Sequence, residues 1–176
     1  MKTTKFIIFL LLINSVINVQ KVQSQSKQLL TEVNFFNVND VAYKLDRLKL
    51  YNSSTIRLEK AKSISKNITE LKQKCVLGFV YSNLLINKLN YYNDRKYISE
   101  LAQIKKIYKN IFNNLKVVQS EFDNMLVNTA SFDKRKLRNL RKKVKICIQN
   151  QNKLHKKSGI LANILKWEKK QAVKSI

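Results

Sequence analysis

Proline is absent from this chain, and glycine occurs only twice among its 176 residues, as Gly78 and Gly159. Sheet proteins change direction at many tight corners, and those corners use glycine and proline more often than helix ends do. The shortage therefore argues against sandwiches, barrels and doubly wound sheets. It predicts an all-α fold.

Acidic residues and histidine are also scarce, which limits the available chemistry. There are 11 acidic and 35 basic residues and one histidine, for a formal net charge of +24. His155 precedes lysines and has no carboxylate close in sequence, so we expect a surface residue. Glu121 and Asp123 are too close in sequence to share one helix face. With no nucleophile and base pair and no metal-ligand spacing, we expect no enzyme, cofactor, metal site or small-molecule substrate.

Long apolar runs are missing except near the N-terminus. Lys2 and Lys5 precede the apolar run 6–13, and the small residue Ser24 follows it. This order is typical of a secretory signal peptide over residues 1–24, cut before Gln25, whereas a membrane-spanning helix needs roughly 20 apolar residues. An uncleaved membrane anchor is the alternative. We expect an exported protein, periplasmic or secreted.

The chain contains two cysteines, Cys75 and Cys147, and both fall at apolar positions of predicted helices. Export to an oxidising compartment favours a disulfide between them, which would stabilise the fold by about 4 kcal/mol in the chain-entropy model. The alternative is two buried free thiols that pack as small hydrophobic side chains.

Apolar residues repeated at spacings of 3 and 4 dominate the rest of the sequence, and this repeat is typical of helices that pack along a seam. It is longest from Tyr97 to Met125 and predicts a long central helix over about 95–127. The seam residues are Tyr97, Leu101, Ile104, Tyr108, Ile111, Leu115, Val118, Phe122 and Met125.

The remaining stretches complete the predicted domain organisation. Residues 25–39 show no sustained period, so we expect a mobile or loosely packed lead-in before a single helical domain over 40–176. A second seam covers 61–78, and residues 75–92 are apolar on every side. That pattern favours a buried or oligomer-facing helix over a membrane span, because polar residues interrupt it. The expected architecture is an elongated helical hairpin or small antiparallel helix bundle with coiled-coil-like seams.

A last long helix is predicted over about 133–155, with a thin apolar seam and a dense cluster of basic residues. Because the bases lie on several sides of this helix, some must face an anionic partner such as a phosphate backbone, a lipid surface or an acidic protein. A solvated surface is the alternative interpretation. The expected anionic-partner face consists of Lys134, Arg135, Arg138, Arg141, Lys142 and Lys145.

This order of elements resembles a known family. The signal peptide, the long helix and the run Ser131-Phe132-Asp133-Lys134-Arg135-Lys136-Leu137-Arg138 leading to Cys147 are similar to TrbJ-type exported proteins of conjugative transfer operons. Those proteins are helical periplasmic components associated with type IV secretion machinery, and the resemblance covers roughly residues 60–165.

The resemblance implies an exported structural or assembly component of a cell-envelope machine, in particular of conjugative transfer. Such a component would work through protein partners or through self-association along its helical seams. The alternative function is that of a secreted cationic helical protein that binds anionic surfaces or nucleic acid.

Overall fold

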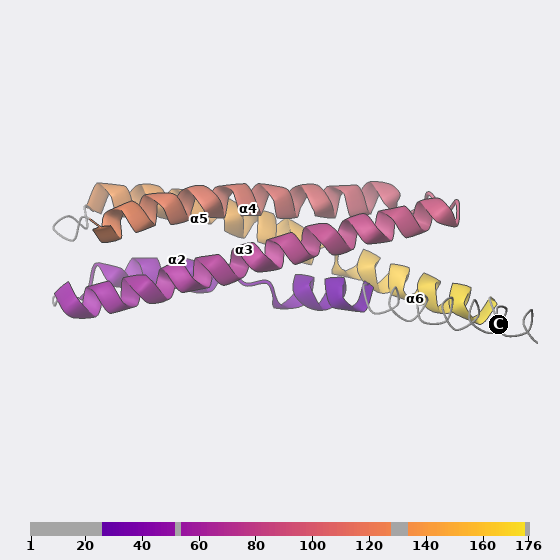
Figure 1. Ribbon diagram of the computed structural model, residues 1–176, viewed down its shortest axis with the longest axis horizontal. Helices are drawn as coiled ribbons and strands as arrows, with labels where there is room; N and C mark the ends of the chain where they lie inside the picture. The colour runs from indigo at the N-terminus through magenta and orange to yellow at the C-terminus, as the bar shows by residue number, and fades with distance from the viewer. Residues whose placement is uncertain (1–25, 52–53, 128–133, 175–176) are drawn as a thin grey trace, which may run out of the picture.

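The computed structural model describes residues 26–51, 54–127 and 134–174, and this part of the chain is an all-α bundle without a β-strand (Figure 1). The predicted fold class is confirmed. The signal peptide predicted at 1–24 lies outside the described residues. A short helical segment covers residues 26–35. The helices that follow it are α2 (Asn39–Leu48), α3 (Ser54–Tyr91), α4 (Ile98–Val127), α5 (Lys134–His155) and α6 (Ser158–Lys174).

Four of these helices enclose one elongated core. α3 and α4 form a long antiparallel hairpin, and α5 runs back along α4 (Figure 1). The shorter α2 contacts both α3 and α5, so it closes the bundle on its fourth side. Near the other end of α3, Lys88 forms an ion pair with Glu168 of α6, and Ser26 donates a hydrogen bond to the same carboxylate.

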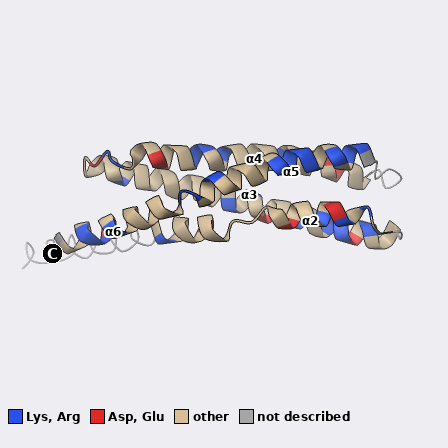
Figure 2. Cartoon of the chain, turned by 180° about the vertical axis from the view of Figure 1, so that it is seen from behind, with Lys and Arg blue, Asp and Glu red and all other residues tan. Residues whose placement is uncertain are grey.

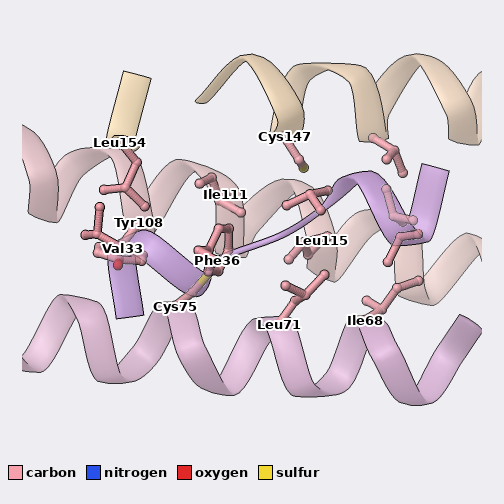
Figure 3. Packing of buried hydrophobic residues seen from close by; sticks show 14 of the residues in the cluster. Val33, Phe36, Ile68, Leu71, Cys75, Tyr108, Ile111, Leu115, Cys147 and Leu154 are labelled. Carbon is pink, nitrogen blue, oxygen red and sulfur yellow. The ribbon is translucent and has the colours of Figure 1, made fainter. Parts of the chain in front are cut away.

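The heptad seams become the core of the bundle. Every α4 seam residue from Leu101 to Met125 is buried, and Tyr97 at the start of the seam is half-buried. The α3 seam keeps the same spacing as far as Leu89. Figure 3 shows Ile111 and Leu115 of α4 lying between the side chains of α3 and those of α5. The long central seam is therefore confirmed as the centre of the fold.

The boundaries of the two long helices lie close to those predicted. The central helix, expected over about 95–127, is Ile98–Val127, and the basic helix, expected over about 133–155, is Lys134–His155. Asp94 accepts a hydrogen bond from the backbone N–H of Lys96 at 3.1 Å in the turn before α4. Differences of one to three residues are ordinary at helix ends, where the last turns lack intrahelical partners.

Residues 26–39 differ from the mobile or loosely packed lead-in that we predicted. The ring of Phe36 packs edge-on against Tyr108 of α4, with centroids 5.8 Å apart. The backbone N–H of Val38 donates to Oε1 of Gln151 on α5 at 2.5 Å. The apolar pattern here is too short to show a period, and its partners lie far away in sequence. The fully buried side chains of this stretch are Ser26, Leu29, Val33, Phe36 and Val38.

Candidate anionic-partner interface

The basic residues predicted on α5 lie on its solvent-facing sides, where Lys and Arg cluster along the first half of the helix (Figure 2). The seam residues Leu140, Val144 and Cys147 point inward and are fully buried. The side chain of Lys134 lies outside the described part of the structure. The other five residues of the predicted face are all exposed, namely Arg135, Arg138, Arg141, Lys142 and Lys145.

A groove between α2 and α5 collects most of these cations. It consists of two adjoining hollows of about 460 and 240 Å³, which share Asp46, Arg138 and Arg141 in their walls. We call this feature the basic groove. Its lining residues are Ala42, Leu45 and Asp46 of α2, Lys49 directly after α2, and Leu137, Arg138, Arg141, Lys142, Lys145 and Ile148 of α5.

Positive charge in the basic groove is poorly balanced. Asp46 is its single lining carboxylate, and Oδ1 of Asp46 lies 3.0 Å from Nε of Arg141. Both side chains are more than a third exposed, so this pair contributes at most about 1 kcal/mol. Within the described residues, Arg138, Lys142 and Lys145 form no ion pair. The groove therefore presents a positive field to solvent.

On the opposite side of α5, an acidic residue of α4 forms an ion pair with one of its lysines. Nζ of Lys143 lies 2.5 Å from Oε1 of Glu121. Beyond the end of α5, Lys157 pairs in the same way with Glu100 at 2.5 Å. Among the described residues, α5 thus has one ion pair toward α4 and one toward α2, and the basic groove keeps a net positive charge because Arg138, Lys142 and Lys145 outnumber its single carboxylate.

Glu121 and Asp123 face different helices, as their spacing predicts. Glu121 contacts Lys143 of α5, and Oδ1 of Asp123 accepts a hydrogen bond from Ser65 of α3 at 2.9 Å. The two carboxylates therefore do not form a shared site.

The predicted disulfide between Cys75 and Cys147 is wrong, because both thiols are free and buried. Cys75 lies on α3 and Cys147 on α5, and these two helices are not direct neighbours in the bundle. Figure 3 shows the two cysteines extending from opposite helices into the core. Burial raises the pKa of the Cys147 thiol to about 12 and raises the pKa of Cys75 further above its usual range, so both stay protonated at neutral pH.

His155 also differs from its prediction as a surface residue. It is half-buried, and its Nε2 lies 3.1 Å from the backbone carbonyl oxygen of Phe36, which places an N–H donor at that nitrogen. His155 therefore holds the end of α5 against the segment before α2. This role depends on a contact between residues 119 positions apart, so the local sequence carries no signal of it.

The outer face of the second half of α3 remains exposed. The core side of residues 75–92 is buried, so the prediction of burial holds for one side of the helix only. None of the helices in the described ranges is long and apolar enough to cross a membrane. An oligomer-facing role for this α3 outer face stays a prediction. Its exposed residues are Val76, Leu77, Val80, Leu84, Tyr91 and Tyr92.

The α2 wall of the basic groove is the part that sequence reasoning missed. Asp46 and Lys49 have the pattern of ordinary solvated residues in and just after a short helix. Nothing in the local sequence indicates that they lie beside α5. In the described part of the chain, no group of three or more His, Cys, Asp or Glu side chains is placed to hold a metal ion.

Comparison of this chain with protein-family models, with curated proteins and with solved structures finds no significant match. The resemblance to TrbJ-type proteins therefore stays a prediction from the sequence.

Proposed function

We propose that this protein is an exported, non-catalytic component of a cell-envelope assembly and that it binds an anionic partner through the basic groove. The observation that supports the proposal is the gathering of Arg138, Arg141, Lys142 and Lys145 beside a single carboxylate, Asp46. The export step rests on the predicted signal peptide, and conjugative transfer is the machine that the TrbJ-type resemblance implies.

The cost of this charge arrangement supports a binding role. Arg138 and Lys142 are four residues apart on one helix, as are Arg141 and Lys145. Like-charge pairs at this spacing destabilise a helix by about 0.2 to 0.5 kcal/mol each. A partner that supplies carboxylates or phosphates would relieve this repulsion, whereas exposure to water alone leaves it in place.

The second candidate is a free secreted cationic protein that binds anionic surfaces or nucleic acid. It is favoured by the basic side chains outside the groove, such as Arg135 and Lys136, at the start of α5. The high net charge also promotes binding to polyanions without a defined site.

The test compares two variants that lose the same number of charges. In the groove variant, the five basic residues that line the groove become Gln, namely Lys49, Arg138, Arg141, Lys142 and Lys145. In the control variant, five lysines of α3 and α4 that lie outside the seams become Gln. These are Lys62, Lys66, Lys106, Lys109 and Lys116. Both variants should stay folded, because Gln keeps helix propensity and none of these positions belongs to a seam.

Binding to duplex DNA and to anionic vesicles is then measured at several salt concentrations. We expect the groove variant to lose at least about tenfold in affinity, while the control variant keeps most of it, with a log-log salt slope near 0.9 per phosphate contact on DNA. Equal losses in both variants would show that net charge alone drives binding. Cell fractionation separates the two candidates, because an assembly component remains in the envelope fraction and a free secreted protein does not.

A further inference from the structure

We infer that the basic groove takes an acidic amphipathic helix of a partner protein. The inference rests on the proposed function, since it assumes that this groove binds an anionic partner, and it adds the chemical class of that partner.

Four of the ten residues that line the basic groove are apolar, and we call these four its floor. Leu45 is almost fully buried there, and Ala42, Leu137 and Ile148 are half-buried beside it. A nucleic-acid or polysaccharide backbone offers charge but little aliphatic surface to cover such a floor. An amphipathic helix presents an aliphatic stripe together with charged flanks, and it binds grooves through residues spaced along one face.

The cationic rim has the spacing that such a helix requires. Arg138, Arg141, Lys142 and Lys145 follow the repeat of one helix face and span about 10 Å along α5, or two helical turns. Glutamates at the same spacing on a helix lying along the groove would reach this row while the helix keeps its apolar stripe on the floor.

Asp46 sets a constraint on the partner. Its carboxylate pairs with Arg141 on the α2 side of the groove, so a partner carboxylate placed there would meet repulsion. Arg138, Lys142 and Lys145 are the side chains left to receive carboxylates. The groove therefore favours acids on the α5 side of the bound helix and neutral residues beside Asp46, because Lys49 also lines the α2 wall.

The test measures binding of three synthetic peptides to the full chain by fluorescence anisotropy. The first is a leucine- and glutamate-containing amphipathic helix of about 16 residues, long enough for four turns. The second has the same composition in scrambled order, and the third is polyglutamate of equal length. At near-physiological salt we expect the amphipathic peptide to bind at least about tenfold more tightly than either of the others.

Two matched isoleucine variants test whether the amphipathic peptide binds in the basic groove. Ile148→Gln alters the floor, whereas Ile146→Gln alters an α5 side chain that is 45% exposed and does not line the groove. We expect Ile148→Gln to weaken the amphipathic peptide about tenfold without changing polyglutamate binding, and Ile146→Gln to change neither. If Ile148→Gln fails to fold, Ala42→Gln tests the same floor from α2.

The outcomes distinguish this inference from the proposed function. Equal affinity for all three peptides, or a floor variant that still prefers the amphipathic peptide, would overturn the helix partner and leave anionic binding by the groove standing. Failure of the peptides, DNA and anionic vesicles to bind would overturn both.

Discussion

In the core, Gly78 of α3 packs directly against the ring of Tyr108 of α4. A Cβ placed on Gly78 would lie 2.3 Å from a ring carbon of Tyr108, far inside van der Waals contact. The Tyr108 ring is fully buried, and its hydroxyl has no hydrogen-bond partner in the described part of the chain. Burial raises the pKa of this hydroxyl well above its usual range. Glycine is therefore the residue that lets an aromatic ring fit between these two helices.

We predict that Gly78→Ala and Gly159→Ala shift stability in opposite directions. Gly78→Ala should lower the free energy of unfolding by about 1 to 3 kcal/mol, because the added methyl group overpacks the contact with Tyr108. Gly159 lies in α6, where an added Cβ would meet nothing within 4 Å, so Gly159→Ala should raise the free energy by up to about 1 kcal/mol. Urea unfolding followed by circular dichroism measures both, and equal shifts would contradict the contact.

α4 is the element on which the bundle depends most, because it contacts α3 on one side and α5 on the other. Its eight buried seam residues lie along one face, and the residues between them are half-buried or exposed. Ile111 has no exposed surface, whereas its neighbour Asn110 is exposed. Adjacent positions on this helix therefore differ completely in what they contribute to stability.

We predict that Ile111→Asp unfolds the protein and that Asn110→Asp leaves it folded. A buried carboxylate without a partner costs several kcal/mol, against a total stability of about 5 to 15 kcal/mol for a domain. Thermal melting of the two variants checks this directly. Similar melting temperatures would show that the α4 seam is not the core.

The basic groove and the α3 outer face lie on different parts of the molecule. The basic groove lies between α2 and residues 137–148 of α5. The α3 outer face covers the second half of α3, whose end lies at the opposite end of the bundle from α2, near the ion pair between Lys88 and Glu168 of α6 (Figure 1). The groove is charged and the α3 outer face is largely aliphatic and aromatic. Under the proposed function, the basic groove would bind the anionic partner, and the α3 outer face would be left for a second contact.

We predict that the α3 outer face mediates self-association of this chain. Analytical ultracentrifugation or cross-linking should detect self-association of the unmodified protein, and replacing Leu77 and Leu84 with Gln should reduce it, since exposed apolar area drives such contacts. DNA binding through the basic groove should be unchanged. The control replaces Lys62 and Lys66, on the polar first half of α3, with Gln. Unaltered association in the Leu77 and Leu84 variant would contradict this role.

Local patterns in the sequence determined the elements and the inward-facing sides of the long helices. The absence of proline, the spacing from Leu101 to Met125 and the cluster of bases in α5 are all properties of neighbouring residues, so they remain visible without a structure. Helical periodicity is such a local property, because 3.6 residues per turn place a seam on one side whatever that side later contacts.

Tertiary structure alone decided which helix each seam meets. Cys75 and Cys147 stay free because α3 and α5 are not neighbours in the bundle, although both sulfurs lie in the core. The basic groove exists because α2 places Asp46 beside Arg141, ninety-five positions later in the chain. Periodicity gives the direction of a side chain about its own helix axis. Which neighbouring helix that side chain packs against is decided by the fit between side chains of the two helices, as in the contact of Tyr108 with Gly78.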